Sequence, residues 1–166
     1  ADAQDARAVQ QTMATLSNAH SPEEAARLAI EAVRTGFGWA YGSYWKIDPA
    51  SNTLRFEVEA GDAGEEFRRV TRTASFAEGI GLSGRAWRSR DLVFVPDIGA
   101  VTDCVRAPIA QRVGVKSGIC FPIQVNGRVV GTMDFFATET LHPSSQRLDA
   151  LRNVGRLVSQ AMERIG

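Results

Sequence analysis

The sequence predicts an α+β domain with a central antiparallel β-sheet of about five to six strands. Three observations lead to this fold class. Helical apolar periodicity marks both ends of the chain, and alternating apolar runs lie between them. Asn126-Gly127, a dipeptide suited to a tight hairpin turn, separates two extended apolar runs. Because both faces of that hairpin carry large apolar groups, we expect terminal helices on one face of the sheet and a lid-like segment on the other.

Composition excludes several classes of protein. The 166 residues are 44% hydrophobic and 23% charged, which is typical of a folded domain. The formal net charge is +0, so we expect no nucleic-acid and no membrane partner. With no apolar run near the roughly 20 residues of a membrane span, no signal peptide and two cysteines, we expect a cytoplasmic location. Since both ends lie in helical sequence, we also expect a domain of a longer protein.

Two helices are predicted at the start of the chain. Val9, Met13 and Leu16 belong to an amphipathic stripe, and we assign residues 1–18 to an N-terminal linker or dimerisation helix. Residues 19–166 then form the folded domain and end in a long signalling helix. Ser21 and Glu24 make a capping box for the second helix, which should run to about Thr35. Gly36 is expected to close that helix.

The middle of the chain predicts strands and short helices. Residues 39–47 and 53–60 alternate and form one hairpin. Short helices are expected near residues 65–69, 85–89 and up to 112, with a brief strand at 93–95. In the Asn126-Gly127 hairpin a two-residue turn would place Phe121 opposite Thr132 and Ile119 opposite Asp134. Pro122 is expected at a non-bonding position or a bulge.

The last helix carries two apolar stripes, whereas one sheet face needs only one. We therefore expect a homodimer through the terminal helices; the alternative is that both helices simply pack on their own sheet. The residues predicted for the dimer helices are Val9, Met13, Leu16, Leu151, Val158, Met162 and Ile165.

Four segments, in this order, resemble the motifs of a known family. They are EGIGLSGRAW (78–87), VFVPDI (93–98), GVKSGICFPI (114–123) and GRVVGTMD (127–134). They are similar to the glycine turn, the strand end, the apolar Pro-Ile strand and the hairpin return of GAF domains. The resemblance covers all but the first ~18 residues. It implies a GAF/PAS-like sheet with terminal helices on one face and a small-molecule pocket under a lid on the other.

The resemblance also implies a function. GAF domains usually sense a small ligand and regulate a covalently attached effector, such as a histidine kinase, a cyclic-nucleotide enzyme, a chemotaxis receptor or a transcription activator. We therefore expect a bacterial, non-catalytic signal-transduction module, not an enzyme. The identity of the ligand varies between GAF domains, and the fold does not specify it.

Eight residues are the candidates for the pocket, chosen as an apolar lining with a few polar groups. Arg106 or Asp103 could fix a charged ligand. The alternative is that Trp87 and Phe94 only fill the core and that Arg106 is a solvated lid residue. The candidates are Tyr44, Trp87, Phe94, Asp103, Cys104, Arg106, Ile109 and Phe121.

The sequence supports a cofactor or a catalytic role more weakly than a ligand pocket, and the identity of any cofactor stays unknown. Cys104 lies near the position of the thioether cysteine in bilin-binding relatives, but Val105 replaces the usual histidine. Haem would need an axial histidine, and His20 and His142 both lie near turns or termini. No metal-ligand cluster stands out. The alternative function is a thiol-dependent reductase similar to free methionine sulfoxide reductase, with Cys104 and Cys120 as the thiols.

Overall fold

The computed structural model describes residues 2–166. Its helices are α1 (Asp2–Leu16), α2 (Pro22–Phe37), α3 (Glu65–Thr73), α4 (Gly81–Ser89), the 3-10 helix η1 (Ile98–Ala100), α5 (Ala107–Val113) and α6 (Ser145–Ile165). Its strands are β1 (Tyr41–Asp48), β2 (Thr53–Gly61), β3 (Ser75–Phe76), β4 (Val93–Val95), β5 (Gly118–Val125) and β6 (Arg128–Phe136). The α+β class that the sequence predicts is confirmed.

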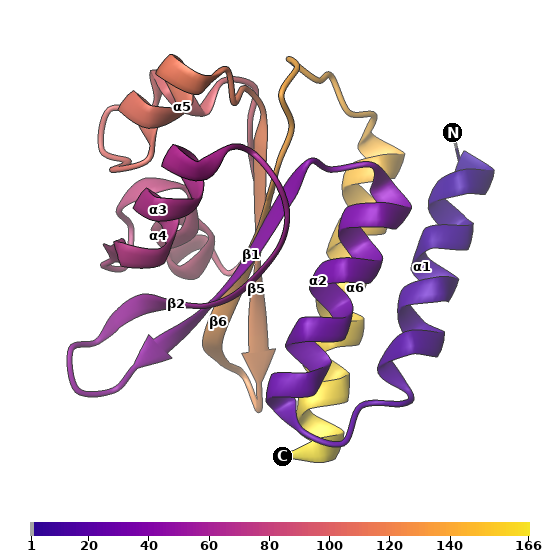
Figure 1. Cartoon of the computed structure of the whole chain (residues 1–166). Coiled ribbons are helices and arrows are strands. Elements are labelled where there is room, and N and C mark those ends of the chain that lie inside the picture. The colour runs from indigo at the N-terminus through magenta and orange to yellow at the C-terminus, as the bar shows by residue number, and fades with distance from the viewer. Residues whose placement is uncertain (1) are drawn as a thin grey trace.

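All six strands form one sheet in the order β3-β2-β1-β6-β5-β4, and every neighbouring pair is antiparallel. Helices α1, α2 and α6 lie on one side of this sheet, and α3, α4 and α5 lie on the other (Figure 1). We call these sides the helix face and the lid face. Each face has its own hydrophobic core, because apolar residues alternate across the strands.

Helix α2 begins as predicted and ends later than predicted. The Ser21 hydroxyl accepts a hydrogen bond from the backbone N–H of Glu24 at 3.1 Å. The helix continues through Gly36 to Phe37, and Gly38 closes it in the left-handed conformation. A Cβ atom at Gly36 would lie 2.9 Å from the Cβ of Ala8, so this glycine permits α1 to approach α2 closely.

The β5–β6 hairpin keeps its predicted turn, but its predicted register is wrong. Next to the turn, Gln124 pairs with Val129 as expected. A bulge between Ile123 and Gln124 then shifts every later pair by one residue, so Phe121 faces Met133 and Cys120 faces Asp134. As a result, Asp134 and Cys120 share the lid face.

The terminal helices pack against this chain's own sheet. Helix α1 lies outermost, against α2 and α6 (Figure 1). Four of the residues predicted for a dimer seam, Leu16, Leu151, Val158 and Met162, are at most 4% exposed and belong to the helix-face core. Those four assignments are wrong, because α1 and α6 pack against each other and α6 packs against α2 and β5 of the same chain, which buries these side chains. Met13 is 51% exposed, and Val9 and Ile165 are partly buried.

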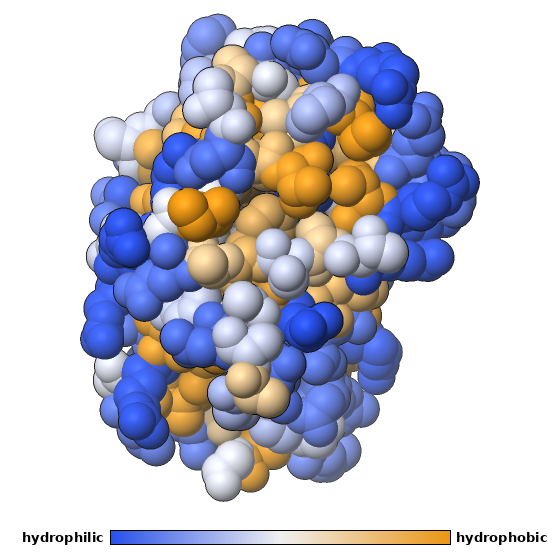
Figure 2. Space-filling view, turned by 90° about the vertical axis from the view of Figure 1, so that its left-hand side faces the viewer, coloured by the Kyte–Doolittle hydropathy of each residue, from blue (hydrophilic) through white to orange (hydrophobic). Residues whose placement is uncertain are grey.

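The lid face is covered by short elements. We call η1, α5 and the loop between them (residues 98–113) the lid. Figure 2 shows hydrophobic residues gathered on this side of the molecule, among hydrophilic ones. Two large apolar side chains are exposed in these segments, Ile80 before α4 (45%) and Val105 in the lid (52%). Within residues 2–166, no helix combines the length and the apolar character that crossing a membrane requires.

Candidate ligand-binding site

A buried ion pair joins the lid to the centre of the sheet. Arg106 precedes α5, and its Nη2 donates to Oδ2 of Asp134 in β6 at 2.7 Å. Both side chains are 0% exposed. Removing one partner of such a pair leaves the other charge buried without a partner, which typically lowers the free energy of unfolding by about 3–5 kcal/mol. Of the three ion pairs that join the lid to the rest of the described chain, this is the one with both side chains fully buried.

The Asp134 carboxylate is held by two hydroxyl groups as well. Ser43 in β1 donates to Oδ1, and Ser83 in α4 donates to Oδ2 at 3.1 Å. The indole N–H of Trp45 in turn donates to the Ser43 oxygen at 2.9 Å. The Asp134 carboxylate therefore accepts hydrogen bonds from β1, α4 and the lid, and these charge-assisted hydrogen bonds fix its position.

Four aromatic rings surround the Arg106 guanidinium. Its Cζ atom lies 4.7 Å from the ring centroid of Phe136, 5.0 Å from that of Trp45, 5.4 Å from that of Phe76 and 5.7 Å from that of Phe67. A cation within about 6 Å of an aromatic centroid is attracted by the ring quadrupole, most strongly where water is excluded. We call these four rings the aromatic cage.

The guanidinium is incompletely satisfied in this cage. Its Nε and Nη1 atoms are buried and have no hydrogen-bond partner among the described residues. The Thr132 hydroxyl, on the β6 residue paired with Trp45, has no such partner either. Burial disfavours the charge of Arg106, but Asp134, Cys104 and Tyr41 together outweigh it, and the net effect raises the pKa of Arg106. Arg106 therefore stays charged while two of its donors remain unpaired.

Both cysteines lie in the lid-face core. Cys104 is 4% exposed and Cys120 is 0% exposed, and neither forms a disulfide. Burial, and then the nearby charge of Asp134, raise the pKa of the Cys120 thiol. A raised pKa keeps Cys120 protonated at neutral pH, which is unfavourable for a nucleophile.

Four of the eight predicted pocket residues do meet on the lid face. Trp87, Cys104 and Ile109 belong to or pack against its core, and Arg106 lies at its centre. The alternative that Arg106 is a solvated residue is therefore wrong. Asp103 points elsewhere and pairs with Arg85 at the surface, at 2.8 Å.

Tyr44, Phe94 and Phe121 do not belong to this site. All three lie in or pack against the helix-face core. Alternation along each strand explains the error, because Tyr44 follows Ser43 and Phe121 follows Cys120, and those neighbours occupy the lid face.

The residues that build the centre of the site were not among the candidates. A usable signal existed for Asp134, since a carboxylate between Met133 and Phe135 in a strand covered on both faces must be paired. No comparable signal identified the others. The missed residues are Ser43, Trp45, Phe67, Phe76, Ser83, Asp134 and Phe136.

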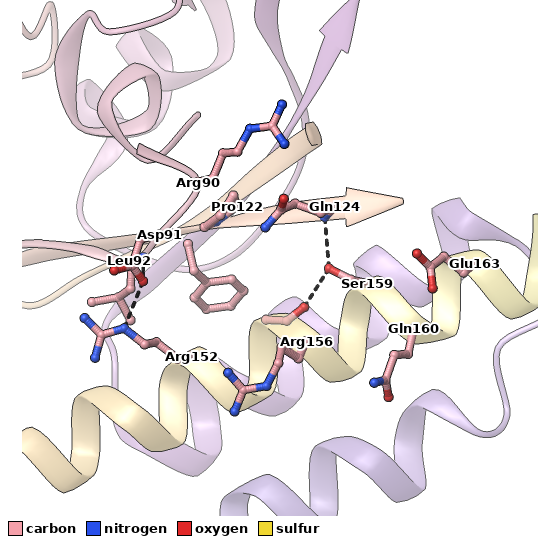
Figure 3. A pocket seen from close by; sticks show the side chains of 12 residues that line it. Arg90, Asp91, Leu92, Pro122, Gln124, Arg152, Arg156, Ser159, Gln160 and Glu163 are labelled. Carbon is pink, nitrogen blue, oxygen red and sulfur yellow. Dashed lines mark hydrogen bonds and ion pairs between the residues drawn. The ribbon is translucent and has the colours of Figure 1, made fainter. Parts of the chain in front are cut away.

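A cavity of about 410 Å³ lies on the helix face between β5 and α6 (Figure 3). Arg152 crosses its rim and donates to Asp91 at 2.9 Å. That hydrogen bond lowers the pKa of Asp91. Deeper in the cavity, the Ser159 hydroxyl accepts from the backbone N–H of Gln124 at 2.9 Å (Figure 3). Among the charged side chains that line this cavity, Arg152 and Asp91 form an ion pair with each other, whereas Arg90 donates to the carbonyl of Gly127 and Arg156 donates to Asn153.

Comparison with known families identifies the domain. The family described as "GAF domain" matches residues 19–163 of this chain. The chain belongs to the GAF family. No curated protein matches it. The matched residues include every strand, α2 to α5 and nearly all of α6, so the GAF fold accounts for both faces of the sheet. Within residues 3–166, no three His, Cys, Asp or Glu side chains group as metal ligands would.

Solved structures with the same fold have different activities. A free methionine-R-sulfoxide reductase from Neisseria meningitidis, in complex with its substrate, is 18% identical, with a TM-score of 0.81 over 99% of this chain and 91% of that chain. The GAF domain of a phosphoenolpyruvate-protein phosphotransferase from Coxiella burnetii is 12% identical, with a TM-score of 0.81 over 98% and 95%. The A. aeolicus nlh2 GAF domain, in an inactive state, is 15% identical, with a TM-score of 0.76 over 98% of both chains.

These similarities correct one prediction. We expected from the GAF resemblance that the domain is not an enzyme. The reductase shares the fold as closely as the phosphotransferase GAF domain does, with TM-scores of 0.81 for both. The GAF fold therefore gives no ground for that exclusion, and the prediction is withdrawn.

Proposed function

We propose that this GAF domain is a ligand-responsive regulatory module. A small molecule that enters beneath the lid would break the Arg106–Asp134 ion pair, and α6 would carry the change to an attached effector domain. The observation that carries this proposal is the ion pair itself, because it links the lid to a central strand of the sheet.

The free energy that the ion pairs contribute to lid closure is small enough for a ligand to change the position of the lid. The other ion pairs that hold it, Arg85–Asp103 and Arg112–Glu66, have partly or fully exposed side chains. Exposed pairs contribute only about 0–1 kcal/mol each. In a buried pair, the cost of removing both charges from water largely offsets their attraction. A ligand that binds the open lid better than the closed lid could therefore shift the equilibrium between them.

A short path of contacts leads from the ion pair to α6. Asp134 pairs with Cys120 across the β5–β6 ladder. The next residue of β5, Phe121, packs against Gly155 of α6, where a Cβ atom would lie 3.0 Å from the Phe121 ring. Spatial proximity of this kind suggests a path, and coupling has to be measured.

Hydrogen–deuterium exchange can measure that coupling. The Arg106→Met variant removes the buried charge that holds the lid. Arg112→Met, in α5, is the control, because Arg112 is 61% exposed and its ion pair with Glu66 contributes little. We expect faster exchange in α5 and in the 155–162 segment of α6 for Arg106→Met, and neither change for the control. Faster exchange in α5 with an unchanged α6 would refute the relay. Native mass spectrometry of freshly purified protein would show any ligand that stays bound.

We also propose that the domain forms a homodimer through the outer face of α1 and α6. Here Val9 and Met13 stay partly or fully exposed after the chain has folded. A groove of about 650 Å³ separates the two helices, with Val9 and Ala150 among its lining residues. A second copy would cover this apolar surface, and two effector domains would then lie side by side.

A second candidate function is thiol-dependent reduction of a small oxidised metabolite. It is supported by the similarity to the Neisseria reductase and by the presence of both cysteines in the lid-face core. The raised pKa of Cys120 argues against that thiol as the nucleophile and leaves Cys104.

An assay with free methionine-R-sulfoxide and dithiothreitol tests this second candidate. Activity that disappears in Cys104→Ser and survives in Cys120→Ser would establish a reductase that uses Cys104. Absence of turnover by the wild-type protein, at concentrations where a known reductase is active, would eliminate it.

A further inference from the structure

We propose that the site beneath the lid recognises a small organic cation with a guanidinium or alkylammonium head group, and that Arg106 occupies the place of this ligand when none is bound. The inference rests on the proposed function, since it names the class of ligand that opens the lid. Arg106 would then be an internal competitor that closes the site in the absence of signal.

The first argument is the shape and chemistry of the aromatic cage. Three of its rings come from strands β1, β3 and β6 and are positioned by the sheet, and the fourth, Phe67, comes from α3, which packs against α5 of the lid. They place a guanidinium carbon 4.7 to 5.7 Å from four centroids. Aromatic groups arranged around one point are a recognition site for organic cations. If Arg106 is withdrawn, the cage remains on the sheet side of the site.

The second argument is the charge at the base of the cage. Asp134 accepts hydrogen bonds from Arg106, Ser43 and Ser83, and the two serines belong to β1 and α4. Opening the lid removes only the guanidinium. The carboxylate then lies among apolar rings with no opposite charge at hydrogen-bond distance, which is costly. A cationic ligand restores that charge balance, whereas a neutral or an anionic ligand does not.

The third argument is that Arg106 is an imperfect occupant. Its Nε and Nη1 atoms are buried without hydrogen-bond partners among the described residues. An unpaired buried donor costs free energy that a free ligand can avoid. An alkylammonium has fewer donors to satisfy, and an alkylguanidinium can orient itself without the constraint of the chain. A free cation can therefore compete with a side chain that is already tethered in place.

The unpaired donors of Arg106 also raise the opposite possibility, an anionic ligand. The Asp134 carboxylate lies 2.7 Å from the same guanidinium, and the remaining surroundings are ring faces, whose quadrupole is negative. An anion would meet repulsion from both. The observations therefore favour a cation.

The test uses the Arg106→Ala variant, which vacates the cage, with Arg112→Ala as the matched control. The probes are the chlorides of methylguanidinium, agmatine, choline and tetramethylammonium at 10 mM, compared with potassium chloride at equal ionic strength. We expect at least one of them to raise the Tm of Arg106→Ala by about 4 °C or more and to shift the Trp45 indole N–H signal in NMR spectra. The double variant Arg106→Ala, Asp134→Asn should lose this response. Arg112→Ala should respond only as weakly as the wild type, because its cage is occupied.

Three results would overturn the inference. The first is a folded Arg106→Ala that none of the four cations stabilises. The second is equal stabilisation of the double variant, which would place the effect outside the cage. The third is stabilisation of the wild type by succinate or phosphate that Arg106→Ala loses, which would make this an anion site.

If Arg106→Ala does not fold, the wild type decides the question. Titration with the same cations should give a saturable shift of the Trp45 signal together with faster exchange in α5, and the absence of any response would overturn the inference. A failure of the cation inference is distinguishable from a failure of the proposed function, because the two are tested by separate experiments. The coupling between lid and α6 in Arg106→Met is measured without any ligand.

Discussion

The hydroxyl group of Ser159 in α6 accepts a hydrogen bond of 2.9 Å from the backbone N–H of Gln124 in β5 and donates one of 2.8 Å to the carbonyl of Gly155. Gln124 lies at the β-bulge that resets the β5–β6 register. A bulge leaves backbone groups without partners in the ladder. Helix α6 supplies one, so the irregularity that places Asp134 on the lid face is stabilised from the helix face.

The Ser159→Ala variant should lower the free energy of unfolding by about 1 kcal/mol, because it leaves the Gln124 N–H without its acceptor. Urea unfolding measures this change. Ser145→Ala, at the exposed start of the same helix, is the control and should stay within about 0.5 kcal/mol of the wild type. Equal effects of the two variants would show that the Ser159 bond contributes nothing specific.

Replacement of Arg106 or Asp134 alone should be strongly destabilising. Arg106→Met and Asp134→Asn should each lower the free energy of unfolding by about 3–5 kcal/mol, because each leaves a charge buried without its partner. The double variant should be clearly more stable than the sum of the two losses predicts. A double-mutant cycle from urea unfolding gives the coupling energy. Strict additivity would mean that the ion pair does not join lid and sheet.

Stability should fall at alkaline pH. Burial raises the folded-state pKa of Cys120 above the value of about 8.5 for an unfolded thiol. The folded state then holds a proton that the unfolded state releases, so stability is complete below about pH 8.5 and decreases above it. Burial also raises the pKa of Tyr41 and Tyr44, which adds to the loss above about pH 10.

Chemical unfolding between pH 7 and pH 10 measures this dependence, and Cys120→Ala should remove the part that begins near pH 8.5. Cys104→Ala is the matched control, since it deletes the other thiol and leaves Cys120 to titrate. An unchanged slope in Cys120→Ala would assign the alkaline loss to other groups.

The proposed homodimer should depend on the outer face of α1. Met13→Glu places a charge on an exposed apolar residue and should shift the protein from dimer to monomer, with little change in the stability of the monomer. Sedimentation velocity at micromolar concentration distinguishes the two states. Gln11→Glu adds the same charge at another exposed position of α1 and should leave the dimer intact. A monomeric wild-type protein would contradict the homodimer.

Much of the fold follows from local patterns. The helical stripes, the capping box at Ser21 and the Asn126-Gly127 turn placed α1, α2, α6 and the β5–β6 hairpin correctly. Each of these signals involves residues within a few positions of one another, and the physics is equally local. The errors concern the register of the hairpin and the end of one helix. The bulge beyond Gln124 shifted the predicted pairs, and the two-residue delay in the end of α2 moved its cap to Gly38.

The candidate site was only partly predictable. Cys104 was chosen because it lies near the position of the thioether cysteine in bilin-binding relatives, and Arg106 because it could fix a charged ligand. The choice of Tyr44 and Phe121 failed, since both are large and apolar but point to the other face of their strands. Both residues were selected by residue type alone, but their side chains lie on the helix face and not on the lid face.

The sequence by itself determined the α+β class, the order of the elements and the need to cover both faces of the sheet. Only the tertiary structure decided that Arg106 meets Asp134, 28 positions away, and that Ser43 meets the same carboxylate from 91 positions away. The physical reason is the separation along the chain over which each kind of interaction acts. Periodicity and turn chemistry act between neighbours in the chain, whereas the burial of a charge depends on whether distant segments bring an opposite charge and enough donors to one point.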